Sequence, residues 1–426
     1  MYKAIVGKLV NVREHPKADR LKLATISGCQ VVVGLDAKEG DMGIFFPEDG
    51  RVSTDFCQAN DLYPRYDEEG NRIGGGFFDP KNNRVRAQAF RGEKSYGYFA
   101  NLDSVAYTGV NLDDLYEGFQ FDILNDHLIC EKYYTPKTLR AMQKNQGVAR
   151  KTNIMFPQHV DTGKWAYEGP TSIDDGDIVY ITEKLHGTSA RVAFVIEEEE
   201  LPARWWDRFI PKSKRTERIE RTWKTLVGTR RIVLKDPITQ GFYADESFRF
   251  KAAEPLHNNL HKGEVVYSEL VGYVNDTTPI MASQDTTSLK DVVKKYGKQM
   301  LYTYGTLPGE CKSYVYRITM VNEDGNVTEL SWPQVKRRCK ELGLLTVPDF
   351  AGPIVDPRFE AIDELVQSLT DGSSTLDDRH IREGVVIRVE KANGQTLYLK
   401  NKSWTFGVLE GYLKNNEDYV DLEESS

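Results

Sequence analysis

The stretch Ile178-Val179-Tyr180-Ile181-Thr182-Glu183-Lys184-Leu185-His186-Gly187 combines a run of β-branched and aromatic residues with a lysine that is followed three places later by glycine. The run predicts a β-strand that carries Lys184 to its end, and residues 190–195 predict the partner strand. A lysine in this setting is, on its own, more often a surface residue before a hairpin glycine. Its meaning therefore depends on the rest of the chain.

Four later segments supply the groups that a nucleophilic lysine needs. They are residues 228–231 (Gly-Thr-Arg-Arg), 267–272 (Tyr-Ser-Glu-Leu-Val-Gly), 382–388 (Arg-Glu-Gly-Val-Val-Ile-Arg) and 399–403 (Leu-Lys-Asn-Lys-Ser). Lys400 and Lys402 alternate on a predicted strand, so both ammonium groups lie on one face. There they could neutralise a triphosphate and the charge that develops during phosphoryl transfer.

A lysine that attacks the α-phosphate of ATP must be neutral, although its ordinary pKa of about 10.4 keeps nearly all of it charged at neutral pH. Neighbouring cations and a bound divalent metal lower that pKa. Glu269 and Glu383 offer carboxylates for a hydrated Mg²⁺ ion. Arg230 can hold a ribose or phosphate with its planar guanidinium, and Tyr316 can stack on a purine.

Each of these residues also has an ordinary structural explanation. The carboxylates could be strand-end charges, the lysine pair could be a solvent-facing strand edge, and Tyr316 could lie in the core. The order along the chain favours the functional interpretation: nucleophile, arginine, carboxylate, aromatic, carboxylate, lysine pair.

This order resembles the covalent nucleotidyltransferase superfamily of ATP-dependent ligases and mRNA capping enzymes, over residues 156–404. The resemblance implies that Lys184, in the family's lysine-x-x-glycine motif with Gly187, forms a lysyl–AMP adduct. It implies that Glu183 and Lys184 present backbone groups to adenine. It further assigns the arginine motif to Arg230, motif III to Glu269, the adenine-stacking aromatic to Tyr316, motif IV to Glu383, and motif V to Lys400 and Lys402.

The chain also departs from the family's pattern in two places. The neighbours of Arg230 differ from the usual serine-arginine-asparagine, which leaves Arg231 without an assigned role. Arg317 stands where the family commonly has an acidic residue.

Three features of the resemblance favour RNA ligases. His186 follows the lysine by two places, as in one branch of RNA ligases, whereas many DNA ligases and capping enzymes have aspartate there. Only 24 residues follow Lys402, too few for the OB-fold barrel that those enzymes carry after motif V. The barrel-like region lies instead at the N-terminus, as in an RNA ligase branch.

Residues 1–125 alternate in short stretches broken by glycine turns, which predicts a small β-barrel. Residues 12–21 and 90–97 resemble two phrases of the tRNA-binding OB-fold domain attached to some aminoacyl-tRNA synthetases. Barrel turns without a ligand explain these phrases about equally well. The expected fold is α+β: an OB-fold barrel at 1–125, a connector at 126–155, and a nucleotidyltransferase domain of two antiparallel sheets with peripheral helices at 156–426.

Two helices and one insertion are predicted within that domain. Ser331 as N-cap with Pro333 in the first turn predicts a helix to Leu342, and apolar spacing predicts another at 359–369. A basic insertion near 200–225 interleaves arginines with tryptophans, which can hold phosphates and stack on bases. A solvated helix face is the alternative for this insertion.

Net charge, cysteine content and hydropathy limit the partners and the cellular compartment that we expect for this protein. A net charge of −8 gives no overall attraction to RNA, so binding depends on local basic patches. Five cysteines without a Cys-x-x-Cys pair argue against structural zinc and disulfides, and favour a cytoplasmic protein. No apolar run is long enough for a membrane helix, so no membrane partner is expected.

These observations predict an ATP-dependent RNA ligase that seals 3′-OH/5′-phosphate breaks through lysyl–AMP. ATP with Mg²⁺ or Mn²⁺ would be its cofactors, a nicked duplex with an RNA 3′-OH end its substrate, and a monomer its state. A DNA ligase or mRNA capping guanylyltransferase with the same nucleophile is the nearest alternative. A non-catalytic tRNA-binding protein is an alternative from a different class.

Overall fold

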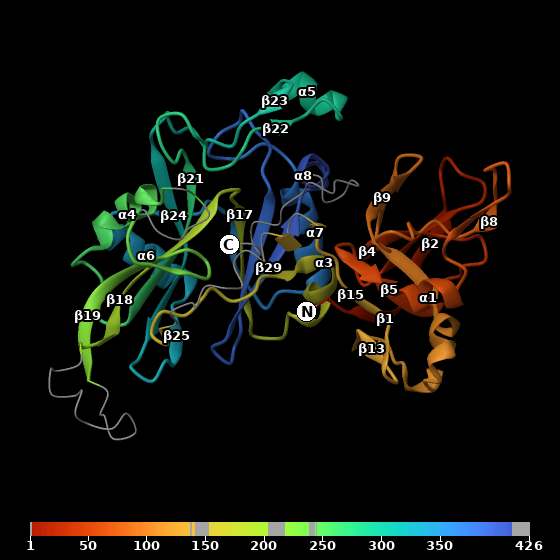
Figure 1. Ribbon diagram of the computed structural model, residues 1–426, viewed down its shortest axis with the longest axis horizontal. Coiled ribbons are helices and arrows are strands. Elements are labelled where there is room, and N and C mark those ends of the chain that lie inside the picture. The colour runs from red at the N-terminus through yellow and green to blue at the C-terminus, as the bar shows by residue number, and fades with distance from the viewer. Residues whose placement is uncertain are drawn as a thin grey trace.

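The computed structural model describes residues 2–136, 139–140, 153–202, 218–237, 243 and 245–410. It is a mixed α+β structure with an N-terminal unit of short strands and a larger domain built on two sheets (Figure 1). Much of the predicted connector and the centre of the basic insertion lie outside the described residues. No helix in these ranges is long and apolar enough to cross a membrane.

Short strands in small sheets make up the N-terminal unit. The two largest sheets have the orders β11-β5-β1-β12 and β2-β3-β4. Their strands are β1 (Ala4–Lys8), β2 (Val10–Glu14), β3 (Lys22–Ile26), β4 (Cys29–Val33), β5 (Met42–Phe46), β11 (Tyr98–Asn101) and β12 (Gln120–Phe121). The two-stranded ladders join β6 (Gly50–Val52) with β15 (Cys130–Lys132), β7 (Pro64–Tyr66) with β8 (Arg72–Gly75), β9 (Ala87–Phe90) with β10 (Glu93–Tyr96), and β13 (Ile123–Leu124) with β14 (His127–Leu128).

The N-terminal unit extends past residue 125, where the connector was expected to begin. Strand β15 pairs with β6, and Ile129 and Cys130 are fully buried in the same core as Val6 and Ile44. Burial of these apolar side chains ties the segment to the unit. All five cysteines of the chain are free, as expected.

Two sheets form the larger domain. One has the order β16-β29-β28-β17-β27, and the other β20-β19-β18-β21-β24-β25 with β26 pairing to β24. The first sheet contains β16 (Gly163–Lys164), β17 (Ile178–Lys184), β27 (Asp349–Val355), β28 (Gly384–Glu390) and β29 (Thr396–Lys402). The second sheet contains β18 (Thr188–Glu200), β19 (Ile219–Gly228), β20 (Val233–Leu234), β21 (Glu264–Gly272), β24 (Cys311–Val321), β25 (Val327–Glu329) and β26 (Leu345–Thr346). Apart from β16 and β26, which pair in parallel, both sheets are antiparallel, as predicted.

The predicted insertion is bounded by strands. Residues 197–200 belong to β18 and pair with residues 219–222 of β19, so the two strands form a long hairpin. Lys224 contacts Glu197 at 3.5 Å and also Glu199. The alternative of a helix face is therefore wrong for these flanks, because they are β-strands that pair with each other along the ladder.

The two predicted helices are present. Helix α6 (Trp332–Leu342) begins with a capping box between Ser331 and Gln334 and ends at Gly343, which has a left-handed φ of 68°. Helix α7 (Phe359–Thr370) buries Ile362 and Val366, two of the residues whose spacing predicted it. The remaining helices are α1 (Thr54–Ala59), α3 (Trp165–Glu168), α4 (Ser247–Ala253), α5 (Lys290–Tyr296) and α8 (Trp404–Glu410), and β22 (Gln284–Asp285) pairs with β23 (Gln299–Met300) beside α5.

The N-terminal unit is in contact with the larger domain near β16 and α8. The Nζ atom of Lys164 lies 3.0 Å from Glu48 and 2.9 Å from Asp49. The rings of Tyr96 and Trp404 meet edge to face at 5.1 Å. The unit is thus held beside the end of β29, where Lys400 and Lys402 lie.

Candidate active site

Three adjacent strands bring Lys184 next to the later lysines. Strand β17 lies between β27 and β28, and its last residue, Lys184, pairs with Gly384, which pairs in turn with Lys402 of β29. A Cβ atom at Gly384 would lie 2.1 Å from the carbonyl oxygen of Asn401. Glycine therefore permits the close approach of β28 and β29 at this point.

Glu383 joins the two lysines. Its Oε1 atom lies 2.9 Å from the Nζ atoms of both Lys184 and Lys402, and its side chain is 3% exposed. Burial opposes ionisation of this carboxyl group, but the two lysines and a hydrogen bond from His186 outweigh it and lower its pKa. A charged carboxylate is thus fixed between two ammonium groups.

His186 is packed behind Lys184. Its ring nitrogens lie 3.6 Å from Glu383 and 3.3 Å from Glu410. Burial alone would lower the pKa of His186, but the two carboxylates raise it to about 9. The backbone N–H of His186 donates to the hydroxyl of Tyr304 at 2.6 Å. The turn after Lys184 is therefore anchored through both its side chain and its backbone.

Gly187 brings this turn against β21. A Cβ atom at position 187 would lie 2.3 Å from the carbonyl oxygen of Leu270 and 3.1 Å from Cγ of Glu269. The hydroxyl of Ser189 donates to Glu269 at 3.4 Å. The glycine of the motif thus places the Glu269 carboxylate near Lys184.

A pocket of about 750 Å³, including its open mouth, lies between the two sheets. Six residues predicted from the sequence line it: Glu183, Lys184, Arg230, Glu269, Tyr316 and Lys400. The other three, Gly187, Glu383 and Lys402, adjoin it through the contacts described above. The structure therefore brings all nine predicted residues into one place, although they span 183–402 in the chain.

One wall of the pocket is aromatic. The ring of His159 packs edge to face on Tyr316 at 5.0 Å and on Tyr398 at 5.3 Å. Burial, with Glu269 close by, raises the pKa of Tyr316, so its phenol stays neutral. Arg230 follows β19 and contacts the exposed Asp161 at 3.1 Å. This wall can stack a purine and present a cation to its sugar or phosphates.

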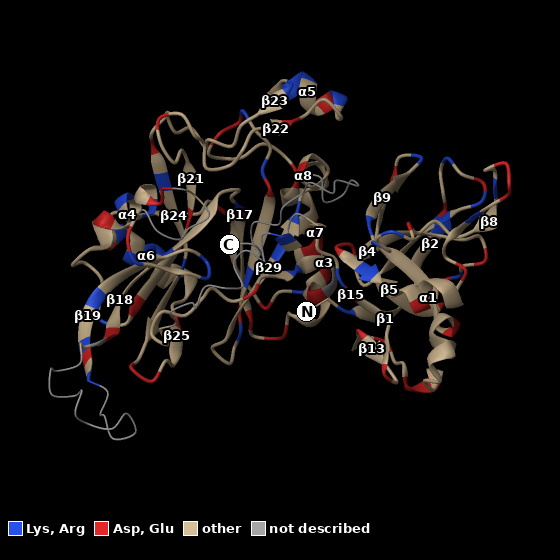
Figure 2. Ribbon diagram, viewed as in Figure 1, with Lys and Arg blue, Asp and Glu red and all other residues tan. Residues whose placement is uncertain are grey.

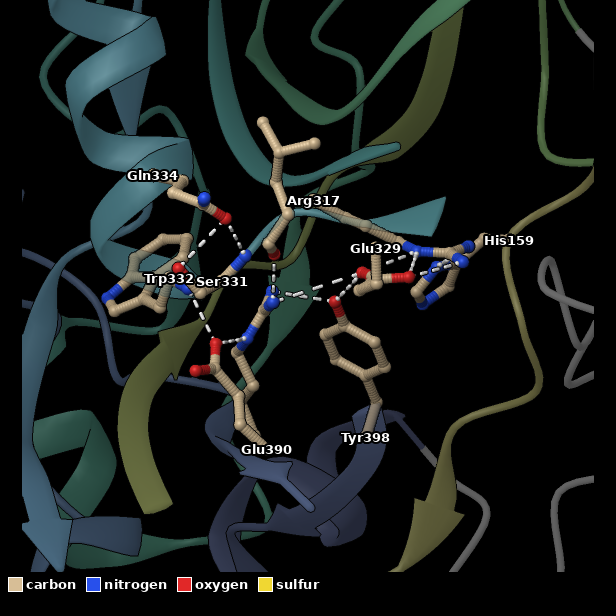
Figure 3. A network of polar contacts seen from close by, with 10 residues as sticks. His159, Arg317, Glu329, Ser331, Trp332, Gln334, Glu390 and Tyr398 are labelled. Carbon is tan, nitrogen blue, oxygen red and sulfur yellow. Dashed lines mark hydrogen bonds and ion pairs between the residues drawn. The ribbon is translucent and has the colours of Figure 1, made fainter. Parts of the chain in front are cut away.

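Figure 3 shows a polar network that joins the two sheets beside this wall. Arg317 contacts Glu329 at 2.8 Å and lies 3.4 Å from His159. Glu329 accepts a hydrogen bond of 2.6 Å from Tyr398, whose hydroxyl accepts one of 2.7 Å from Arg388. Arg317 thus occurs where an acidic residue is common because Glu329, on the neighbouring strand, supplies the negative charge.

Glu183 differs from the expectation in one respect. Its backbone N–H donates to the carbonyl of Pro348 at 2.9 Å, so this group is already occupied. One carboxylate oxygen accepts from the N–H of Thr375 at 3.0 Å, and the other is buried without a hydrogen-bond partner among the described residues. The buried carboxylate oxygen of Glu183 is therefore a group that a base could meet.

Several residues of the site were not identified from the sequence. His159, Trp332, Arg388 and Tyr398 line the pocket, and Tyr304 supports the turn after the nucleophile. Arg388 lies within a segment recognised as important, so its charge on a buried strand was an available signal. The others carry no local signal because only the folded topology places them at the pocket.

The fold and the pocket define a nucleotidyltransferase of the ligase class, with a lysine at a strand end, paired carboxylates, basic residues and an aromatic wall. A family model described as RNA ligase matches residues 177–402, more than half of the chain. The chain therefore belongs to the RNA ligase family, as its sequence predicted.

Solved structures of Naegleria gruberi RNA ligase share the fold. A mutant with ATP and Mn covers 97% of this chain and 99% of that chain at 16% identity, with a TM-score of 0.56. A mutant without ligand covers 97% and 98% at 17% identity, with a TM-score of 0.57. A mutant with AMP and Mn covers 97% and 99% at 16% identity, with a TM-score of 0.55. The search of curated proteins gave no match.

Proposed function

We propose that this RNA ligase joins a 3′-hydroxyl to a 5′-phosphate, with Lys184 as the residue that carries AMP. The amine of Lys184 attacks the α-phosphate of ATP and releases pyrophosphate. The AMP then passes to the 5′-phosphate of the nucleic acid, and the 3′-hydroxyl attacks that phosphate and displaces AMP. The position of Lys184, at the pocket and 2.9 Å from Glu383, is the observation that carries the proposal.

The residues around Lys184 have distinct tasks in this scheme. Its ammonium group pairs with Glu383, so it must leave that ion pair and lose a proton before it attacks. Lys402 keeps the buried carboxylate neutralised meanwhile, which avoids the cost of an unpaired buried charge. Lys400 lines the pocket and is placed to stabilise negative charge on the transferring phosphate.

ATP with Mg²⁺ or Mn²⁺ fits the donors at the pocket. The Naegleria gruberi structures hold ATP or AMP with Mn, and Glu269 lines the pocket of this chain. Such ions are bound by one or two carboxylates together with substrate phosphates and water, and the ion supplies charge neutralisation at the phosphates. Glu269 is the better-placed ligand, because both oxygens of Glu383 already face lysine or histidine.

We infer that the N-terminal unit is an OB-like module that holds the RNA. Its two phrases that resemble a tRNA-binding domain lie against each other in the structure. The Nε2 atom of His15 lies 3.0 Å from the carbonyl of Phe90, and Arg91 donates to the carbonyl of Lys17 at 2.8 Å. We further propose that the protein acts as a monomer on a nicked duplex with an RNA 3′-OH end.

The deciding experiment is the intact mass of the purified protein after incubation with ATP and Mg²⁺. Wild-type protein should gain one AMP, and Lys184→Ala should gain none while keeping its circular dichroism spectrum. Undiminished labelling of the variant would remove Lys184 from its role. Labelling by GTP and not ATP would favour the guanylyltransferase alternative, and RNA binding without any covalent nucleotide would favour a non-catalytic protein.

A further inference from the structure

A basic projection stands at the upper end of the larger domain in Figure 1. It comprises residues 284–300, where β22 and β23 pair at the base and α5 forms the tip, and we call it the α5 projection. Four of its six charged residues are lysines, although the chain as a whole carries a charge of −8. Figure 2 shows positions of Lys or Arg on α5, clear of both sheets, and Lys298 follows the helix.

Three of these lysines have no partner in the described part of the chain. Lys290, Lys294 and Lys298 are exposed, and none of them is paired with a described carboxylate. Lys295, the fourth, donates to Ser373 at 3.0 Å and so serves the fold. Elsewhere in the larger domain, lysines such as Lys336 and Lys391 lie within 2.8 Å of aspartates.

The stability of α5 explains only part of this arrangement. Asp291 in the first turn and Lys294 in the last turn are each placed favourably for the helix dipole. Lys290, at the first position of the helix, is placed unfavourably, and it shares a face with Lys294 four residues later. The exposed Lys290 and Lys298 thus have no role in stabilising α5 and are suited to an external anion.

The base of the projection is connected to the nucleophile. The hydroxyl of Tyr302 donates to Gln284 at 2.7 Å, and Gln284 donates to Glu410. Glu410 contacts His186 at 3.3 Å, two residues from Lys184. A molecule whose anionic group is bound at the tip would therefore approach the active site from the side of α8.

We propose that Lys290, Lys294 and Lys298 contact the sugar-phosphate backbone of the RNA that this enzyme seals. The inference rests on the proposed function, and it adds a binding surface on the catalytic domain that is separate from the N-terminal unit. A polyanionic strand is the partner that fits unpaired lysines on an otherwise acidic protein, since each phosphate contact releases bound counterions. Such contacts position a strand without reading its sequence.

The test compares two double variants of the full chain with the same change in charge. Lys290→Glu/Lys294→Glu reverses the charge of two lysines in the α5 projection. Lys251→Glu/Lys340→Glu reverses the charge of two exposed lysines on α4 and α6, which lie far from α5 in Figure 1. Binding to a nicked duplex with an RNA 3′-OH end is followed by fluorescence anisotropy from low to high salt. AMP capture from ATP is measured for every protein.

The projection variant should bind at least about tenfold more weakly near 0.1 M salt, with AMP capture unchanged. The neutral variant Lys290→Gln/Lys294→Gln should lower the slope of log affinity against log salt by about 2, one for each lost phosphate contact. The control variant should bind within about twofold of wild type.

Wild-type affinity and slope in both projection variants would overturn the proposal. Failure of the proposed function has a different signature, in which wild-type protein captures no AMP and seals no nick. The neutral variant retains a decisive readout if charge reversal impairs folding.

Discussion

Tyr304 connects a strained backbone to the turn that follows Lys184. Its φ of 51° is left-handed, which is rare for a bulky residue, and its ring is buried against His380 at 4.5 Å. Strained conformations persist where surrounding contacts fix them, often at functional sites. Here the contact is the hydroxyl that accepts the N–H of His186.

Tyr304→Phe should slow AMP capture by about tenfold, because the buried N–H of His186 would lose its acceptor and the turn would lose its anchor. Single-turnover labelling with ATP measures the effect, and the KM for ATP should change less than the rate. Tyr63→Phe is the control, since its hydroxyl donates to Asn83 within the N-terminal unit. Equal rates in Tyr304→Phe and wild type would show that the anchor is dispensable.

Asp377 fixes the backbone that follows Tyr304. It accepts from the N–H of Gly305 at 2.9 Å and from Arg379 at 2.8 Å. Burial alone would raise the pKa of this carboxyl group, but the hydrogen bonds lower it to about 2. The charged form is therefore favoured by the fold.

Because the pKa of Asp377 is lower in the folded than in the unfolded state, its contribution is present above about pH 4 and is lost as the pH falls through 2. The contribution is on the order of 2 kcal/mol. Urea unfolding of wild type and Asp377→Asn at about pH 6 and about pH 3 measures it. The gap between the two proteins should narrow on acidification, and a constant gap would contradict the assignment.

At the scale of elements, the capping box of α6 offers a direct test of helix stability. The N–H of Ser331 donates to the side chain of Gln334 at 2.8 Å, and the adjacent Trp332 is 1% exposed in the core. Ser331→Ala should lower the free energy of unfolding by about 1 kcal/mol. Ser368→Ala within α7 should change it little, because alanine favours helix interiors.

Elements were predictable where local chemistry decides them. Ser331 and Gly343 marked the ends of α6, and β-branched residues marked β17, because caps and strand preferences act over a few residues. Residues 190–195 of β18 were predicted as a strand, but the rest of its hairpin with β19 was missed, because its glutamates and arginines are polar on both strands and pair only across the ladder. Charge patterns of this kind do not distinguish a helix face from a strand.

The residues of the candidate site could be predicted from the sequence, but their arrangement in space could not. The order of Lys184, Glu269 and Glu383 along the chain indicated their common purpose. That Glu383 lies between Lys184 and Lys402 follows from the register of three strands, which no local pattern specifies. His159 reaches the pocket by the same long-range packing, so its segment gave no signal.

At the scale of the whole molecule, Lys164 holds the N-terminal unit against the catalytic domain. Burial of Asp49 opposes its ionisation, but Lys164 outweighs this effect and lowers the pKa of Asp49. Lys164→Glu would replace the ammonium group with a carboxylate that faces those of Glu48 and Asp49. Repulsion among these three carboxylates would separate the N-terminal unit from the catalytic domain.

Lys164→Glu should reduce sealing of a nicked duplex by about tenfold or more and leave AMP capture within about twofold of wild type. Small-angle scattering should show a larger radius of gyration, and Lys164→Arg should behave as wild type. Equal losses of both activities would show that the contact serves the stability of the catalytic domain instead of RNA binding.

The pairing of Arg317 with Glu329 constrains how this enzyme can change over evolution. Replacing Arg317 with the acidic residue common in the family would set two carboxylates against each other on neighbouring strands, next to Tyr398. A lineage can pass between the two arrangements only if both positions exchange their charges, since either single step sets two like charges against each other. The two sites are therefore epistatic, and ancestral intermediates between them should be poorly folded.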